Sequence, residues 1–337
     1  MLEITLLSFI TTFLVSFVLT KKPLVLSNPT ERGLHTKSVS TSGGVAILLG
    51  YLVYLSSSLP INKMLEDLLN GEIYPLTVVS LLAISIIGFL DDKYKLKKST
   101  RFLFQIILSL TVVISYEFPI LIDLVLIFMV VYFINSYNFM DGIDTLAIFQ
   151  AIFMIFSVML LLGEFLTPLF ILSIILLAFL FFNLSPAKLF LGNSGSYFLG
   201  FYLGILLVSL HYHGKLDFLD GLILYSVFLV DTVYVIIRRF FNKFLRNLKE
   251  DKPILENLSL SLSHITKAHC THNYQNLAKI NENHFKVVTL LMIYNILWCL
   301  PLALLSINIP AYQLFFFFIS CTPYAIWCYL NNAGLED

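Results

Sequence analysis

Long apolar runs alternate with short polar segments along most of the chain. A transmembrane helix needs about 20 mostly apolar residues, and about eleven runs come near that length. The predicted helices lie near 2–20, 43–59, 73–90, 102–117, 120–136, 145–162, 169–183, 196–213, 221–237, 287–305 and 310–330. This pattern predicts an all-α polytopic membrane protein whose residues 1–337 form a single integral-membrane domain.

The composition supports a membrane protein. Hydrophobic residues make up 58% of the 337 residues and charged residues 12%, against about 25% charged residues in soluble domains. The net charge of zero says nothing about nucleic acid by itself, and the positions of the charges matter more. We expect no nucleic-acid partner. Lys21 and Lys22 follow the first apolar run, whereas a cleavable signal peptide carries its positive charge in front. We therefore expect a retained first helix with its N-terminus outside.

The distribution of positive charge agrees with that orientation. With the N-terminus outside, all lysines and arginines except Lys63 and Lys215 fall on the predicted cytoplasmic side. Residues 238–286 form the longest of the predicted cytoplasmic loops. The polar motifs fall on the same side, at 27–44, 91–101, 135–144, 188–196 and 264–278. Five polar segments at one face of a helical bundle predict one functional site.

An acidic pair ends the third predicted helix. Asp91 and Asp92 stand in "GFLDDKYKLKKSTRFLFQ", and adjacent carboxylates repel each other unless a cation lies beside them. They are either loop charges paired with neighbouring lysines, or a pair that binds a divalent cation and moves a proton at the membrane surface.

A second polar motif, "NSYNFMDGIDTLA", spaces Asn135, Asn138, Asp141 and Asp144 three residues apart. In a continuous helix such steps keep side chains on one slowly turning face. Ionisable groups at the end of an apolar helix are costly and default to a functional role. The alternatives are a helix cap with a turn at Asp141, or the aspartate-rich type of motif with which prenyl transferases hold a metal-bound diphosphate.

The segment "LFLGNSGSYFLG" joins two apolar runs through an uncharged polar loop. Gly192 and Gly195 permit left-handed backbone or close approach of a ligand. The residues Ser194–Ser196 then begin a predicted helix, whose N–H groups favour an anion such as a diphosphate. The alternative is a serine-capped helix start after a tight turn.

Histidines gather in "SHITKAHCTHNYQNLA". His269 and His272 share a face if this stretch is helical, and contact with phosphate or a nucleotide is the favoured interpretation. A zinc site with Cys270 and a plain amphipathic helix are the alternatives, but no second Cys/His pair stands at zinc-finger spacing.

Together these motifs resemble the bacterial polyprenyl-phosphate N-acetylhexosamine-1-phosphate transferase family (glycosyltransferase family 4). The resemblance runs from about Asn28 to Ala278. It includes "NPTERGLHTKSVSTSGG" as a first cytoplasmic loop, and "AHCTHNYQNLA" is closest to members that start O-antigen or related polysaccharides.

The resemblance implies transfer of a sugar-1-phosphate from a uridine-diphosphate N-acetylhexosamine to a polyprenyl phosphate such as undecaprenyl phosphate, with release of UMP. It implies a multi-pass protein of the bacterial inner membrane, Mg²⁺ (or Mn²⁺) as cofactor, and leaves a homodimer open. The residues that it implies are Asp91 and Asp92 as catalytic groups, Asn138 and Asn193 as metal ligands, and Arg32, His35, Lys95, Asp141, Asp144, Arg238, Arg239, His269 and His272 as substrate-binding groups.

The sequence departs from the family pattern at several positions. Ser38 and Ser40 stand where prolines are usual, and Thr145 replaces a glycine. Asn193 replaces an aspartate that is usually a magnesium ligand. An amide still offers a carbonyl oxygen but removes one negative charge, so the chain is expected to be an active variant or, alternatively, an impaired relative.

Two other classes of membrane protein, transporters and prenyl transferases, are the alternatives. A transporter would place carboxylates at mid-membrane beside broken helices, whereas these carboxylates end helices on one side. A prenyl transferase would release inorganic diphosphate instead of UMP.

Overall fold

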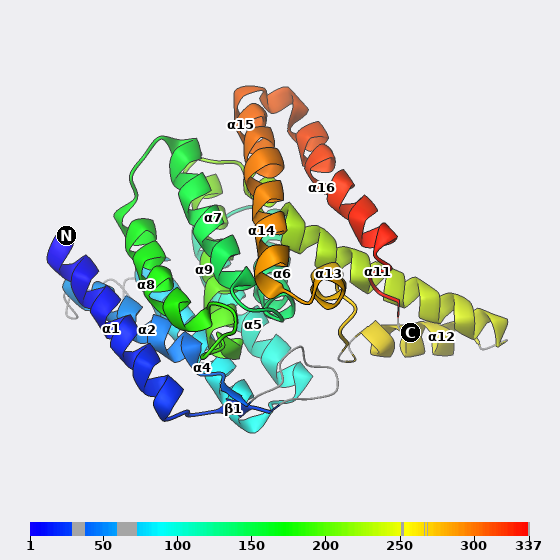
Figure 1. Ribbon diagram of the computed structural model, residues 1–337. Helices are drawn as coiled ribbons and strands as arrows, with labels where there is room; N and C mark the ends of the chain where they lie inside the picture. Colours follow the sequence, from blue (N-terminus) through cyan, green and yellow to red (C-terminus); the bar gives the residue numbers. More distant parts are fainter. Residues whose placement is uncertain (29–37, 59–72, 251–252, 266, 268, 336–337) are drawn as a thin grey trace. The chain divides into compact units, whose positions relative to one another are not determined.

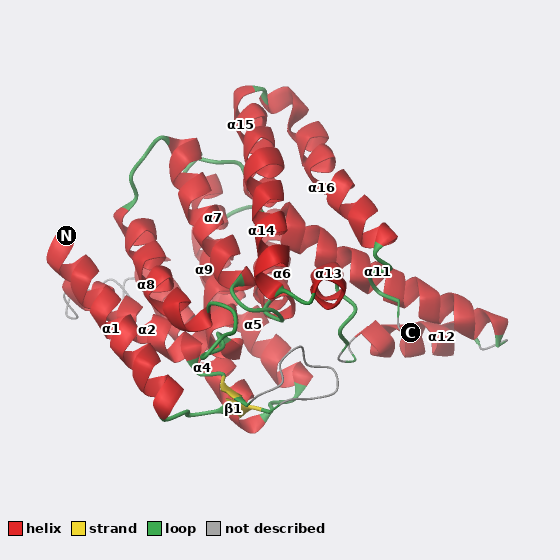
Figure 2. Ribbon diagram, in the orientation of Figure 1, coloured by secondary structure: helices red, strands yellow, loops and turns green. Residues whose placement is uncertain are grey.

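The computed structural model describes residues 1–28, 38–58, 73–250, 253–265, 267 and 269–335. Their regular structure is almost entirely helical (Figure 2), apart from a short antiparallel pair of strands, β1 (Leu26–Ser27) and β2 (Val39–Ser40). The all-α prediction is confirmed. The described residues form two compact units that divide after Gly221, and the expectation of a single domain stays a prediction.

The first unit contains most of the helices (Figure 1). In chain order they are α1 (Leu2–Lys21), α2 (Gly43–Ser58), α4 (Ile73–Tyr94), α5 (Lys98–Val113), the 3₁₀ turn η1 (Ile114–Tyr116), α6 (Ile120–Met140), α7 (Leu146–Leu162), α8 (Thr167–Asn183) and α9 (Gly192–Tyr212). Helix α10 (Phe218–Leu224) crosses the division between the units.

Helix α9 lies at the centre of the first unit, packed against α2, α4 and α6. It is the most buried of the long apolar helices described. Gly88 lets α4 approach α9 closely, because a side chain at Gly88 would collide with the backbone of Asn193 and Ser194. This close packing fixes the end of α4 against the start of α9.

The second unit contains α11 (Ser226–Lys249), α12 (Ile254–Ile265), α13 (Asn273–Asn281), α14 (His284–Tyr294), the π turn η2 (Asn295–Cys299), α15 (Leu300–Asn308), the 3₁₀ turn η3 (Pro310–Tyr312) and α16 (Gln313–Leu330). Helix α12 packs along the C-terminal half of α11, and α16 also packs on α11. The segment 238–286, expected as a loop, is therefore largely helical in its described residues.

Seven helices in the described residues are long and apolar enough to cross a membrane, or eight if α10 and α11, bent by 82°, form one span. Helices α2, α7 and α8 are apolar but shorter. Each of the predicted apolar runs thus has a helical counterpart, and a polytopic membrane protein is confirmed. The count of eleven spans is not.

Candidate functional site

Asp91 and Asp92 lie in the last turn of α4 and are buried, with exposed fractions of 3% and 8%. The helix ends at Tyr94, and Lys95 follows in the left-handed region with φ +53°. The N–H of Lys95 donates to the carbonyl oxygen of Asp91 over 2.9 Å. The two carboxylates are therefore part of a rigid helix end and not of a mobile loop.

Asp91 is compensated by donors from two other helices. Its Oδ2 accepts hydrogen bonds from Arg101 Nη1 at 2.8 Å, Asn193 Nδ2 at 2.7 Å and the Tyr197 hydroxyl at 3.3 Å. Because the Arg101 guanidinium forms an ion pair with it, the charge of Asp91 is neutralised within the protein.

The side chain of Asp92, from α4, lies against the N-terminus of α9. Its Oδ2 accepts the backbone N–H of Asn193 at 2.9 Å. Gly192 makes this approach possible, since it has φ +72° and a side chain there would meet Thr41 and Asp92. A helix N-terminus attracts an anion, and here the anion is the carboxylate of Asp92. The expected diphosphate would have to share this position with it.

Asn138 and Asn193, the expected metal ligands, lie side by side. Asn138 Nδ2 donates to Asn193 Oδ1 at 2.6 Å and to Ser196 Oγ at 3.2 Å. The amide of Asn193 thus links Asp91, through its nitrogen, to Asn138, through its oxygen. Asn135, from the same motif, turns elsewhere and donates to Gln105 Oε1 at 2.7 Å.

The step-of-three pattern does not continue on one helix, because α6 ends at Met140 and Asp141 is its C-cap residue. Asp144 lies in the turn that follows and accepts the N–H of Ala187 at 3.2 Å. Burial first, and then the charges of Asp92 and Asp144, raise the pKa of Asp141 above its ordinary value. The expectation of one shared helix face was wrong, but these carboxylates do lie near one another.

The donor atoms of this cluster suit a hard cation. No group of three or more His, Cys, Asp or Glu side chains in the described residues is arranged to hold a metal, which gives no support to zinc at Cys270. Mg²⁺, however, prefers carboxylate and amide oxygens, and Asn138, Asp141 and Asn193 offer these. Burial first, and then the neighbouring carboxylates Asp92 and Asp144, raise the pKa of Asp141, and a bound cation would favour its charged form. These residues therefore fit Mg²⁺.

In the second unit, Arg238 and Arg239 are held by backbone carbonyl groups. Arg238 Nη1 donates to Ala333 O at 3.0 Å, and its guanidinium lies over the rings of Tyr234 and Tyr329. Arg239 is 1% exposed and donates to His264 O at 3.1 Å. Arg239 is thus a deeply buried cation, and Arg238 is partly buried.

His269 and His272 come together without a shared helix. Their ring centroids are 4.9 Å apart, but His269 precedes α13 and His272 is its N-cap residue. The condition for a shared helical face, that this stretch be helical, is therefore not met, although the rings are neighbours. Burial first, and then His272, Arg239 and His264, lower the pKa of His269 to about 3.

Asp231 organises this histidine segment from α11. Fully buried, it accepts His272 Nδ1 at 2.9 Å, the N–H groups of Asn273 and Tyr274 at 3.1 Å, and the hydroxyl of Tyr324 at 2.9 Å. One carboxylate thus orients an imidazole and caps α13.

The sequence reasoning missed Arg101, Tyr197 and Asp231. Arg101 and Tyr197 stood inside motifs that were singled out, and their partner could not be read from spacing. Asp231 did carry a signal, since an acidic residue inside an otherwise apolar helix is functional by default.

The structure brings together Asp91, Asp92, Asn138, Asp141, Asp144 and Asn193 in the first unit, with Lys95 at the rim. It brings together Arg239, His269 and His272 in the second unit, whereas the described contacts of Arg238 are with Ala333, Tyr234 and Tyr329. Arg32 and His35 lie outside the described residues.

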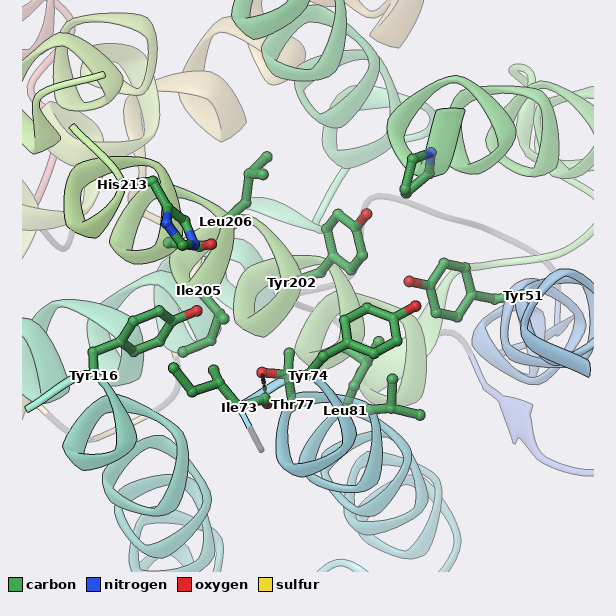
Figure 3. Close-up of a pocket in the computed structure, with 13 residues that line it drawn as sticks. Tyr51, Ile73, Tyr74, Thr77, Leu81, Tyr116, Tyr202, Ile205, Leu206 and His213 are labelled. Carbon is green, nitrogen blue, oxygen red and sulfur yellow. Dashed lines mark hydrogen bonds between the residues drawn. The ribbon is translucent and has the colours of Figure 1, made fainter. Parts of the chain in front are cut away.

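A cavity of about 270 Å³ also lies in the first unit, lined by residues that include Tyr51, Tyr74, Thr77, Tyr116 and Tyr202 (Figure 3). Thr77 and Asp91 are fourteen residues apart on α4, which corresponds to about 21 Å along a helix. The cavity is therefore separate from the carboxylate cluster.

Residues 74–211 match glycosyl transferase family 4. The chain is 28% identical over 279 residues to a Bacillus subtilis (strain 168) protein named as a probable undecaprenyl-phosphate N-acetylglucosaminyl 1-phosphate transferase, with 72% of this chain and 75% of that protein covered. It is 27% identical over 206 residues to an undecaprenyl-phosphate alpha-N-acetylglucosaminyl 1-phosphate transferase of Thermotoga maritima, with 58% of this chain and 60% of that protein covered. The matched family segment contains every residue of the carboxylate cluster.

Proposed function

We propose that the chain is a member of glycosyl transferase family 4, which residues 74–211 match, and that it transfers N-acetylhexosamine-1-phosphate from a uridine-diphosphate sugar to undecaprenyl phosphate, as the names of its relatives suggest. Both relatives are named for N-acetylglucosamine, which makes uridine-diphosphate N-acetylglucosamine the first donor to test. The observation that carries the proposal is the carboxylate and asparagine cluster, which lies inside the family segment and joins α4, α6 and α9.

In the proposed reaction an oxygen of the lipid phosphate attacks the β-phosphorus of the donor. The bond between that phosphorus and the bridging oxygen breaks, and UMP leaves with the bonding electron pair. Such a transfer depends mainly on positioning and charge neutralisation.

The contacts of the two aspartates divide their roles. Asp91 is committed to Arg101, Asn193 and Tyr197, so we assign to it the positioning of Asn193. Asp92 is held by backbone N–H donors and has no ion pair in the described residues. We propose that Asp92 accepts the proton of a protonated lipid phosphate and orients the attacking oxygen.

Mg²⁺, when bound, would offset the negative charge that develops on the diphosphate. Asn138, Asp141 and Asn193 would hold it. The hydrogen bonds described for Asn138 use its nitrogen, and the carbonyl oxygen of Asn193 keeps a second lone pair. The loss of one charge at Asn193 predicts weaker Mg²⁺ binding than an aspartate would give.

From the resemblance we further propose Lys95 as a phosphate contact in the first unit. We also propose Arg238, Arg239, His269 and His272 as substrate contacts in the second unit. Asp231 accepts a hydrogen bond from His272 Nδ1 and so fixes the orientation of this imidazole. We further propose an inner-membrane location with the carboxylates facing the cytoplasm, and a role at the start of a surface polysaccharide on its lipid carrier.

The test is UMP release by the purified full-length chain in vesicles with undecaprenyl phosphate, Mg²⁺ and a panel of uridine-diphosphate sugars. The wild type is expected to release UMP with an N-acetylhexosamine donor, and Asp92→Asn to lose that release while keeping its thermal stability. Lys215→Gln, which removes an exposed ion pair with Glu164, is the matched control and is expected to behave as the wild type.

Asp91→Asn distinguishes the role of Asp91 from that of Asp92, because this variant is expected to lower thermal stability as well as activity. If the wild type releases no UMP with any sugar while Asn193→Asp does, the chain is an impaired relative. Inorganic diphosphate as the product would contradict the proposal in favour of prenyl transfer.

A further inference from the structure

Helix α11 changes from apolar to basic at Arg238. Its first half is apolar, whereas the stretch from Arg238 to Lys249 carries five basic residues: Arg238, Arg239, Lys243, Arg246 and Lys249. So many charges are too costly within the hydrocarbon of a bilayer. The helix therefore leaves the apolar layer near Arg238 and continues for about 18 Å beyond it.

Helix α12 packs antiparallel on this second half of α11. Arg239 donates to His264 O at 3.1 Å, and Asn257 Nδ2 donates to Phe244 O at 3.0 Å. The residues buried in the hairpin are polar: Asn247, Asn257 and Ser261 are each fully buried. We refer to residues 238–249 and 254–265 as the α11–α12 hairpin.

The outer surface of the hairpin is apolar. On α11 the exposed fractions are 54% for Phe241, 54% for Leu245 and 41% for Leu248, and on α12 they are 71% for Ile254, 82% for Leu255, 40% for Leu258 and 49% for Leu262. This arrangement is the reverse of a helical hairpin in water, which buries apolar side chains and exposes polar ones.

The two apolar stripes lie on the same side of the hairpin. On each helix the residue after the buried asparagine belongs to the apolar stripe: Leu248 on α11 and Leu258 on α12. Each lies about 100° around its helix axis from the contact between the two helices. Since the helices are antiparallel, the same rotation from their contact brings both stripes to one side. The result is one continuous apolar surface instead of two separated faces.

The charge of the hairpin indicates what covers that surface. Its five basic residues exceed the acidic Glu250 and Glu256 that accompany them in the described residues. An apolar helical face rimmed by lysine and arginine is typical of helices that lie in the interface of an anionic membrane. The chain is itself a polytopic membrane protein, so lipid is present beside it.

We propose that the α11–α12 hairpin lies in the membrane interface, with its apolar side in the acyl layer and its basic residues at anionic headgroups. The histidine segment follows α12 directly and would thereby be held at the level of the lipid phosphates. The inference rests on the membrane character of the chain and not on the transfer reaction, so either can fail without the other.

The experiment uses tryptophan fluorescence of the full chain in vesicles of brominated phosphatidylglycerol and phosphatidylcholine. The native Trp298 and Trp327 are first replaced by phenylalanine. Single tryptophans are then introduced as Leu245→Trp and Leu258→Trp on the apolar side, with Arg246→Trp and Ser259→Trp as the adjacent control positions.

The expected result is loss of most fluorescence to brominated lipid at 245 and 258, and quenching mainly by aqueous acrylamide at 246 and 259. Acrylamide quenching at 245 and 258 would overturn the proposal, because the surface would then face water. Quenching there by neither agent would also overturn it, since protein, such as a second copy of the chain, would then cover the surface. Retention on gel filtration at the wild-type volume verifies the fold of each variant.

Discussion

Asn193 donates its side-chain amide to Asp91 Oδ2 over 2.7 Å. An aspartate at position 193 would replace this donor with an oxygen and set carboxylate against carboxylate. The asparagine therefore lets α4 and α9 close on each other without a bound cation, which an aspartate at this position would need.

Asn193→Asp is accordingly expected to lower the free energy of unfolding by about 1–3 kcal/mol in EDTA, the cost of a buried group left without its partner. Mg²⁺ is expected to restore it. Thermal unfolding with and without Mg²⁺ measures both effects, with Asn193→Ala as the control that Mg²⁺ does not rescue. Equal stability of Asn193→Asp and the wild type in EDTA would contradict the account.

Thr145 is in the left-handed region, with φ +70°, although it is β-branched and buried. Glycine adopts this conformation without strain, whereas left-handed backbone costs other residues about 1–2 kcal/mol. Thr145→Gly is therefore expected to be more stable than Thr145→Ala by about 1 kcal/mol. Denaturant unfolding of the pair measures this, and a more stable alanine variant would show that the backbone is not strained there.

Asp231→Asn tests how the histidine segment is organised. Asparagine cannot accept from all of the donors that meet Asp231, and it disturbs the tautomer of His272. We expect a drop in kcat of at least about tenfold, by analogy with the loss of an orienting group beside a functional histidine, with the chain still folded.

A double-mutant cycle with His272→Ala decides whether Asp231 acts through that imidazole. If it does, adding Asp231→Asn to His272→Ala causes no further loss of kcat. A further loss of similar size would show that Asp231 acts mainly by capping α13. Tyr324→Phe, which removes a different hydrogen bond to Asp231, is the matched control.

His269 predicts a pH dependence of stability. Its pKa is lowered to about 3 in the folded protein, below the ordinary value of about 6.5, so the unfolded chain takes up the proton first as the pH falls. Stability that is present above about pH 6.5 is thus lost progressively towards pH 3. His269→Gln is expected to flatten this dependence, and exposed His213→Gln to leave it unchanged. Identical slopes for His269→Gln and the wild type would contradict the assignment.

Much of the fold could be predicted because apolar runs of membrane length are hard to mistake, and the motifs at their ends showed where polar groups gather. Predictions that assumed continuous helix failed where the chain turns, at Asp141 and at His272. Spacing could not reveal the partners of Asp91 either, because Arg101 and Asn193 meet it only after α4, α5 and α9 pack. The inverted α11–α12 hairpin was hidden, since its polar contact and apolar surface alternate like those of any amphipathic helix.

The most direct test of the proposed reaction follows the β-phosphate of the donor. Uridine-diphosphate N-acetylglucosamine labelled with ³²P at the β-position is incubated with the full chain, undecaprenyl phosphate and Mg²⁺, and the organic phase is counted. The account predicts that label enters the lipid in step with UMP release, and that it does so in Lys215→Gln but not in Asp92→Asn. Label that stays in the nucleotide, or appears as inorganic phosphate, would contradict sugar-1-phosphate transfer.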